Sequence, residues 1–350
     1  MTAPKTKVAV LSFAHGHATG YMRNLAGRAD VELVASDPDG PYAAERASRG
    51  PDHAKQLGVR YLDTYEEVFA WGPDAVVVCS ENTRHRELVE RAAGAGAHVL
   101  CEKPMATTVP DAEAMLAATR AAGVHLMVAF PVRFSPAFET LRAKVRAGEL
   151  GTVQSIVGTN NGMLPLDRAW FTDPELSGGG SLVDHVVHCA DMIDCLLGEQ
   201  AASVYAVTNQ ILYSDVGAQV ETGGLVTVTY PSGVIATIDC SWSQPRTAAT
   251  WGGLSLEVIG TNGGVKIAPF GTHVGGYGPD GAIWLSYGPD FDALMIDEFL
   301  TAIRTGRGPQ PDGGVGVRTT AIMAAAQRSA HTGAVVPYPL NHSFATTDKR

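Results

Sequence analysis

The chain has 350 residues, a length typical of about two domains. Hydrophobic residues make up 45% of it and charged residues 18%, which is ordinary globular composition and excludes a disordered or collagen-like chain. The formal net charge is −10 and no basic cluster opposes it, so neither nucleic acid nor a membrane surface is expected as a partner.

The apolar runs and the cysteines bear on the cellular location of the protein. The longest apolar runs are too short to cross a bilayer, and the first residues show no signal-peptide pattern. The five cysteines are scattered and form no C-x-x-C pair, so neither a disulfide framework nor a cysteine zinc site is expected. These patterns predict a cytoplasmic protein.

Strands and helices alternate over roughly the first 150 residues. Strands are predicted at 7–11, 31–36, 74–80, 97–101 and 125–130. Helices are predicted at 17–28, 83–94, 110–122 and 136–147. The run at 74–80 is rich in valine throughout, as in a parallel strand covered on both faces. This alternation predicts an α/β domain with a parallel sheet.

The pattern changes after about Gly151. Val/Thr-rich, partly alternating segments follow at 152–159, 203–212, 224–230 and 234–241. Turn residues separate some of the later segments, which favours antiparallel hairpins. Helices are predicted at 180–197 and 290–305. The second domain is therefore expected to be α+β with a mostly antiparallel sheet. The predicted limits are 1–130, 131–340 and a tail at 341–350, with a helix at about 315–333 that is able to pack back on the first domain.

The turn after the first strand reads Ser12-Phe13-Ala14-His15-Gly16-His17. Serine and alanine occupy the first two glycine positions of a dinucleotide-binding turn. One interpretation is a phosphate site made by backbone N–H groups at a helix start, with the histidines as further donors. The other is an ordinary strand–helix turn, and the residues leave both open.

Asp37 ends the second strand, about 20 residues beyond that turn. A carboxylate there is able to accept both ribose hydroxyls of NAD and to repel the 2′-phosphate of NADP. Asp37-Pro38-Asp39-Gly40 is also turn-like, so a capping role is the alternative. The next cation along the chain is Arg46. We therefore expect NAD to be preferred over NADP.

Glu102-Lys103-Pro104 follows a predicted parallel strand directly. Ligands of open parallel sheets bind at the carboxyl ends of the strands. Lys103 is therefore a candidate proton donor or oxyanion stabiliser, although such a tripeptide is more often a surface turn.

Three glycines precede a helix that carries Asp184 and His188. These two residues are four apart, so they project from one helical face. A carboxylate beside an imidazole orients a general base and stabilises its protonated form, whereas His185 is expected to face elsewhere. A capping aspartate and a core histidine form the alternative.

A metal site is the alternative use of the same residues. Asp184 and His188 would supply two ligands, and His15 or His17 a further one. Mononuclear sites need three or four converging ligands, and no third ligand converges by spacing. A metal-free site is therefore expected.

Several motifs together resemble one family. The series VVVCSEN, GAHVLCEKP, VRFSP and GGGSLVDHVVHCAD, in that order, resembles the Gfo/Idh/MocA oxidoreductases, and the resemblance runs from about Lys7 to Pro339. It implies an N-terminal Rossmann domain, a C-terminal domain with an open, mostly antiparallel sheet used in oligomer contacts, and NAD(H) or NADP(H). Two departures are the non-glycine turn and Glu81, which stands where proline is usual.

The resemblance assigns roles to individual positions. Lys103 matches the family's E-K-P lysine, and Asp184 and His188 match its D-x-x-x-H pair, so these three are the expected catalytic residues. Residues expected near the cofactor are Ser12, Phe13, Ala14, His15, Gly16, His17, Asp37, Ser80, Glu81, Asn82, His85, Glu102, Lys103 and Arg133. Residues expected near the substrate are Lys103, Arg133, Trp170, Asp184 and His188.

The resulting hypothesis is a hydride-transferring oxidoreductase that acts on a sugar, inositol or related polyol bound between the domains. His188 would take the hydroxyl proton, Asp184 would orient His188, and Lys103 would stabilise the same oxygen. A homodimer or homotetramer formed through the C-terminal sheet is implied by the resemblance. Two alternatives stay open: a glycoside hydrolase or lyase that uses NAD transiently, and a non-catalytic sensor that binds dinucleotide or sugar.

Overall fold

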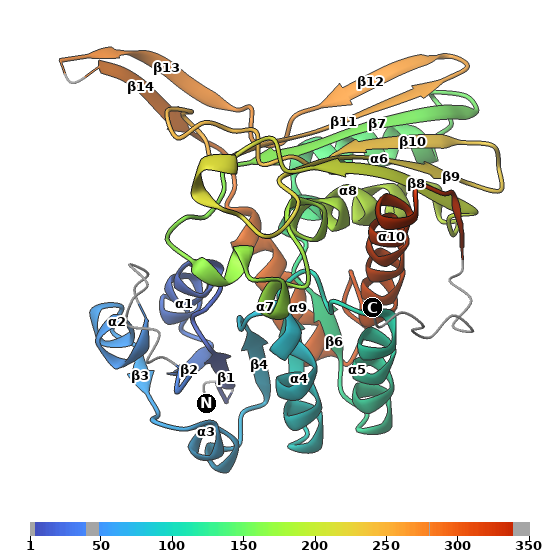
Figure 1. The fold of residues 1–350 in the computed structure, drawn as a ribbon. Coiled ribbons are helices and arrows are strands. Elements are labelled where there is room, and N and C mark those ends of the chain that lie inside the picture. The colour runs from blue at the N-terminus through green and yellow to red at the C-terminus, as the bar shows by residue number, and fades with distance from the viewer. Residues whose placement is uncertain (1–3, 40–48, 280, 339–350) are drawn as a thin grey trace, which may run out of the picture. The chain divides into compact units, whose positions relative to one another are not determined.

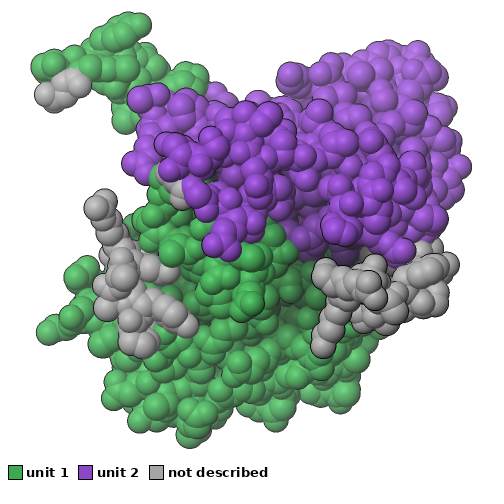
Figure 2. Space-filling view, viewed as in Figure 1, with its two compact units in different colours: residues 1–135, 164–180, 272–320 green, residues 136–163, 181–271, 321–350 purple. Residues whose placement is uncertain are grey.

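The computed structural model describes residues 4–39, 49–279 and 281–338 (Figure 1). Arg46 and the predicted tail at 341–350 lie outside the described residues. The chain divides into two compact units (Figure 2). Unit 1 comprises 1–135, 164–180 and 272–320, and unit 2 comprises 136–163, 181–271 and 321–350. The domain limits drawn from the sequence stay a prediction.

Unit 1 is built on a six-stranded parallel sheet in the order β3-β2-β1-β4-β5-β6. Its strands are β1 (Thr6–Leu11), β2 (Val31–Ser36), β3 (Arg60–Tyr61), β4 (Ala75–Val78), β5 (His98–Cys101) and β6 (Leu126–Val128). Its helices are α1 (His17–Ala26), α2 (Gly50–Gln56), α3 (Tyr65–Trp71), α4 (His85–Gly94), α5 (Val109–Ala121), α7 (Pro174–Ser177) and α9 (Phe291–Thr305). The predicted parallel sheet is confirmed, whereas β3, α2 and α3 were not predicted.

The core of unit 1 explains why its central strands are uniformly apolar. All four residues of β4 are buried, because helices cover both faces of the sheet. One face packs against α1 and against α9, which joins this core from far along the chain through Phe299 and its neighbours. Helix α4 contacts β4 and β5 and packs on α5. Because both faces are covered, the polar side chains lie at the ends of the strands.

Unit 2 contains a seven-stranded sheet in the order β12-β11-β7-β10-β9-β8-β15. Its strands are β7 (Val153–Gly162), β8 (Ser203–Asn209), β9 (Gly223–Thr229), β10 (Ile235–Asp239), β11 (Gly252–Gly260), β12 (Gly263–Ile267) and β15 (Val336–Pro337). The predicted mostly antiparallel sheet is confirmed, with β7 and β10 as a parallel pair inside it. Helix α6 (Pro136–Arg146) packs on helix α8 (Ser181–Leu197), and α10 (Gly313–Thr332) begins in unit 1 and ends in unit 2.

Among the residues that the structure describes, helices of unit 2 cover one face of its sheet and leave side chains on the other face exposed. Helix α8 contacts β7, β9 and β10, and at Gly158 of β7 an added Cβ would lie 3.1 Å from the Cys189 sulfur of α8. The strands alternate between buried and exposed residues, as expected for a sheet with one open face. The exposed positions include Val157, Tyr205, Val207, Leu225 and Ile235.

Unit 1 also carries a hairpin that the sequence did not predict, formed by β13 (His273–Gly278) and β14 (Gly281–Ser286). It forms a separate two-stranded sheet. In the described part of the chain, no helix combines the length and the apolar character needed to span a membrane.

Candidate functional site

The turn between β1 and α1 keeps the backbone of a glycine-rich turn without its first glycine. Ser12 adopts φ +66°, a left-handed conformation that side chains rarely adopt. Local bonds compensate for this strain, because Ser12 N donates to Ser36 O at 2.8 Å and Ser12 Oγ accepts from Ala14 N at 3.3 Å. A serine therefore holds the chain where the fingerprint would have its first glycine.

Asp37 lies beside this turn at the end of β2 and is buried. Its carboxylate accepts hydrogen bonds from the backbone N–H groups of Phe13 at 3.1 Å and Gly50 at 3.0 Å. Arg49 adds a two-point ion pair, with Nη2 at 2.6 Å and Nε at 3.0 Å from the two carboxylate oxygens. Arg49 was not predicted, because it reaches Asp37 from twelve residues away at the start of α2 and follows no recognisable local spacing.

The loop after β4 is tied to the loop after β5 by His85. The His85 ring is fully buried, with Nε2 3.2 Å from Ser80 O and Nδ1 3.0 Å from Pro104 O. Asn82 is bound in the same region, where its Nδ2 donates to Ser177 O at 2.8 Å. Glu81 is buried, with Oε1 3.6 Å from Arg49 Nη1. His85 is thus placed to position the Glu102–Lys103 segment.

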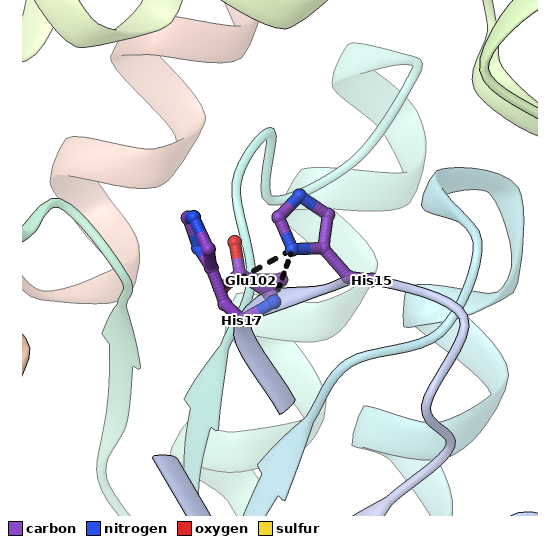
Figure 3. A group of neighbouring side chains, drawn as sticks. All are labelled: His15, His17 and Glu102. Atoms are coloured by element: carbon purple, nitrogen blue, oxygen red, sulfur yellow. Dashed lines mark hydrogen bonds and ion pairs between the residues drawn. The ribbon is translucent and has the colours of Figure 1, made fainter. Parts of the chain in front are cut away.

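Glu102 is the centre of a buried polar cluster at the carboxyl end of β5 (Figure 3). Its Oε1 accepts a hydrogen bond from Tyr21 Oη at 2.6 Å and lies 2.9 Å from His17 Nδ1 and 3.8 Å from His15 Nδ1. Its Oε2 accepts from the backbone N–H of Lys103 at 3.0 Å. The predicted residues His15, His17, Glu102 and Lys103 are therefore brought together.

The charges of this cluster follow from burial and from the neighbours. Burial alone would raise the pKa of Glu102, but His15, His17 and Lys103 hold that pKa well below its usual value. Burial lowers the pKa of His15 well below its usual value and outweighs the attraction of Glu102. Burial also opposes the charge of His17, yet the adjacent Glu102 raises the pKa of His17 overall. An ionised carboxylate thus lies between a neutral and a more basic imidazole.

Trp170 and Arg168 hold the same turn from a short helical segment, Ala169–Thr172, and the residue before it. Trp170 Nε1 and Arg168 Nε both donate to Ala14 O at 3.1 Å. The Arg168 guanidinium packs directly over Gly16, where an added Cβ would lie 2.6 Å from it, so a larger residue there would displace the end of the arginine side chain. Arg168 was not predicted. Arg133 was predicted as a site residue, and it is buried in the segment Pro131–Phe134 of the same unit.

Helix α8 of unit 2 carries Asp184 and His188, one helical turn apart and each partly exposed. The N–H groups of Ser181 and Leu182 donate to the backbone and side-chain oxygens of Glu221, which satisfies two of the N–H groups at the start of the helix. Asp184 Oδ2 accepts from Trp242 Nε1 at 3.1 Å.

The expectation that His185 faces elsewhere was wrong. His185 Nε2 lies 3.1 Å from Asp184 Oδ2, and the ring is buried. Gly162 makes room for it, since an added Cβ there would lie 3.0 Å from the ring. Helical spacing alone assigned Asp184 to His188, because neighbouring residues usually diverge and the gap at Gly162 is a tertiary feature.

The predicted site residues thus fall into two sets. Unit 1 holds the turn, Asp37, the loop of Ser80 to His85, Glu102, Lys103, Arg133 and Trp170, whereas unit 2 holds Asp184 and His188. Within the described residues, His15, His17 and Glu102 form a group whose possible metal-ligating atoms all lie within 4.8 Å of one another.

Comparison with protein families matches both parts of the chain. Residues 22–130 match a model described as an oxidoreductase family with an NAD-binding Rossmann fold. Residues 138–266 match a GFO/IDH/MocA C-terminal domain.

Individual proteins match over most of the chain. A 1,5-anhydro-D-fructose reductase of Ensifer adhaerens is 31% identical over 300 residues, covering 82% of this chain and 87% of that protein. An inositol 2-dehydrogenase of Rhizobium meliloti is 30% identical, covering 88% of this chain and 92% of that protein. Among solved structures, GenD2 from gentamicin A biosynthesis, in complex with NAD, has a TM-score of 0.84 and 25% identity, covering 96% of this chain and 97% of that one.

Proposed function

Because the chain belongs to the Gfo/Idh/MocA family of NAD-binding oxidoreductases, we propose that it transfers a hydride between NAD and a carbinol or keto carbon of a sugar, inositol or related polyol. The observation that carries this proposal is the placement of Glu102 and Lys103, buried directly after β5 and beside the turn that begins α1. The carboxyl ends of these strands are where an open parallel sheet binds its ligand.

The residues of unit 1 fit a dinucleotide. Ser12 preserves the left-handed backbone of the fingerprint, and α1 begins directly after the turn. Asp37 lies at the end of β2, where a ribose-binding carboxylate is expected. Bound NAD supplies the hydride acceptor at its nicotinamide ring.

The proposed chemistry uses one side chain from unit 1 and two from unit 2. His188 takes the proton of the substrate hydroxyl as the hydride leaves the carbinol carbon, and the C–O bond becomes a carbonyl. Asp184 lies one turn away on α8 and stabilises the imidazolium. The Lys103 ammonium donates a hydrogen bond to the reacting oxygen, which carries negative charge in the transition state. Reduction of a keto substrate uses the same groups in reverse.

We propose that NAD is preferred over NADP, and that Asp37 and Arg49 set the preference together. The Asp37 carboxylate offers acceptors to the ribose hydroxyls and repels a 2′-phosphate. The Arg49 guanidinium, 2.6 Å from that carboxylate, offsets part of the repulsion. The preference is therefore expected to be moderate.

We further propose a homodimer or homotetramer formed through the open face of the unit 2 sheet. Val157, Tyr205, Val207, Leu225 and Ile235 lie on exposed positions of neighbouring strands, and β9, which carries Leu225, contains no charged residue. A contiguous apolar surface of this kind is typical of an interface. A cytoplasmic location is proposed as well, since all five cysteines are free thiols.

The test is a screen of sugars, inositols and polyols with NAD and NADP, read by reduced-nicotinamide absorbance and by thermal shift. Net reduction of NAD with at least one of these compounds is the expected result. Transient absorbance without net build-up would instead indicate a hydrolase or lyase that recycles its cofactor. Dinucleotide binding without turnover of any compound, in either direction, would indicate a sensor and contradict the proposal.

A further inference from the structure

We propose that His15, His17 and Glu102 form a binding site for a divalent transition-metal ion, and that an ion bound there weakens the binding of the dinucleotide. The second half of this statement rests on the proposed function. The ligand set is two imidazole nitrogens and one carboxylate oxygen, which suits Zn²⁺ and its spectroscopic substitute Co²⁺.

The three ligand atoms are already close to the required geometry. His17 Nδ1 lies 2.9 Å and His15 Nδ1 3.8 Å from the same carboxylate oxygen of Glu102, and all three atoms lie within 4.8 Å of one another. Tetrahedral bonds of 2.0–2.1 Å would place ligand atoms about 3.3–3.4 Å apart. The separations between the ligand atoms therefore need to change by no more than about 1.5 Å to accept an ion, and His15 Nδ1 gives up the hydrogen bond that it accepts from His17 N.

Figure 3 shows the two imidazole rings flanking the Glu102 carboxylate. The rings come from one turn, separated only by Gly16, and their centroids are 4.4 Å apart. Glu102 comes from a different strand, so the site joins β1 and β5 across the end of the sheet. The three side chains therefore meet through the tertiary fold, and their proximity does not follow from the spacing within one helix or one loop.

The surroundings support these side chains in a manner typical of metal sites. Tyr21 Oη donates to Glu102 at 2.6 Å and Lys103 N donates to the other carboxylate oxygen, which fixes the orientation of the carboxylate. Trp170 and Phe171 pack against the His15 ring, at centroid distances of 6.3 and 5.8 Å. Hydrogen-bonded carboxylates and an apolar wall around a ligating imidazole are recurrent outer-shell features.

Three protein ligands leave one coordination position of a tetrahedral ion open. Two of the ligands belong to the turn that would hold the cofactor pyrophosphate. An ion that draws both imidazoles toward Glu102 fixes this turn and places them where the pyrophosphate approaches. We therefore expect antagonism between metal and dinucleotide, so the ion inhibits the enzyme and takes no part in its chemistry.

Metal binding is tested on tag-free, chelator-treated full-length protein, by calorimetry with Zn²⁺ and by visible spectroscopy with Co²⁺. The expected result is one strong site, with the intense visible absorption of a tetrahedral Co²⁺ ion. His17→Gln and Glu102→Gln should each weaken Zn²⁺ binding by more than about tenfold, since even outer-shell partners change metal affinity by roughly 10–100-fold.

The matched control is the double variant H98Q/H125Q. This histidine pair also lies in unit 1, with ring centroids 4.8 Å apart and with His98 Nδ1 accepting from His125 N, as His15 Nδ1 accepts from His17 N. The double variant should bind Zn²⁺ as wild type does. Equal loss in the control, or only a weak octahedral Co²⁺ spectrum in the wild type, overturns the site. The wild-type spectrum decides the matter even if a variant fails to fold.

The coupling is tested by titrating NADH with and without one equivalent of Zn²⁺ and following nicotinamide fluorescence. A raised Kd for NADH with Zn²⁺ in the wild type, and an unchanged Kd in His17→Gln, is the expected result. An unchanged Kd in the wild type overturns the antagonism. Failure of the metal-free protein to bind NADH at all would contradict the proposed function, and the Zn²⁺ and Co²⁺ measurements would still decide whether the metal site exists.

Discussion

The two units bury their sheets differently, and their ionisable side chains are distributed accordingly. In unit 1 the central strands are buried on both faces, and Asp37, Glu102 and Lys103 lie just beyond strand ends. In unit 2 the sheet keeps an open apolar face, and the expected general base lies on a helix. In unit 1 the ionisable side chains thus gather at the carboxyl ends of parallel strands, whereas in unit 2 the two expected catalytic residues lie on one face of a helix.

The largest effect is expected from the helix of unit 2. His188→Ala should reduce kcat by about 10²–10⁴-fold, because general acid–base catalysis is worth that much. It should also flatten the acid limb of the pH–rate profile, because the general base whose protonation stops the reaction would be absent. The measurement is kcat/KM against pH.

His185→Gln is the matched comparison for His188→Ala. His185 is the neighbour that contacts Asp184 in the structure, so its removal should perturb Asp184 but leave the acid limb in place. If the acid limb is lost in His185→Gln and kept in His188→Ala, the base has been assigned to the wrong histidine.

The next effect is expected from the strand end of unit 1. Lys103→Met should lower turnover by about 10²–10³-fold, the value of one preorganised donor at a developing oxyanion. Cofactor affinity, followed by NADH fluorescence, should stay nearly unchanged. Turnover within a few-fold of wild type would remove Lys103 from the mechanism.

Cofactor choice tests the paired charges of unit 1. Asp37→Ala should lower kcat/KM for NAD by about one to two orders of magnitude, since hydrogen bonds to charged groups are worth roughly 1.5–3 kcal/mol. Asp37→Ala should also narrow the gap between NAD and NADP. Arg49→Gln should widen that gap, because it removes the cation 2.6 Å from Asp37 and so increases the repulsion of NADP. Both ratios of NAD to NADP are measured. Equal ratios in wild type and both variants would show that other residues recognise the ribose.

The smallest effect on activity is expected from the open face of unit 2. Leu225→Glu places a charge at a residue that is 59% exposed on β9, so it should dissociate the oligomer while changing monomer stability by only about 0.5 kcal/mol. Ile211→Glu, at a residue 76% exposed outside the strands, is the control. Light scattering that finds the same mass for wild type and Leu225→Glu would place the interface elsewhere.

Local patterns predicted most of the fold. The valine run of β4, the helix start at Pro110 and the turn between the segments predicted at 224–230 and 234–241 depend on nearby residues, and their elements formed as expected. The sequence did not predict the short elements α2 and β3 or the parallel pairing of β7 with β10. Their stability comes from tertiary packing, for which a single sequence has no local pattern.

The site was predictable where position along a strand determines it. Glu102 and Lys103 follow β5, and Asp37 follows β2, so strand ends located them. The contacts of Arg49 with Asp37, of Trp170 and Arg168 with Ala14, and of His185 with Asp184 were not predictable. Each depends on a side chain reaching across the fold or into a gap left by a glycine.

The central claim is that Lys103 of unit 1 and His188 of unit 2 act on the same substrate oxygen. A double-mutant cycle tests it, with kcat measured for wild type, Lys103→Met, His188→Ala and the double variant on the best substrate from the screen. Residues that act as a unit lose far less together than the product of their separate losses. The account predicts a double variant about as slow as the slower single variant. Losses that multiply would show that the two residues act independently and would contradict it.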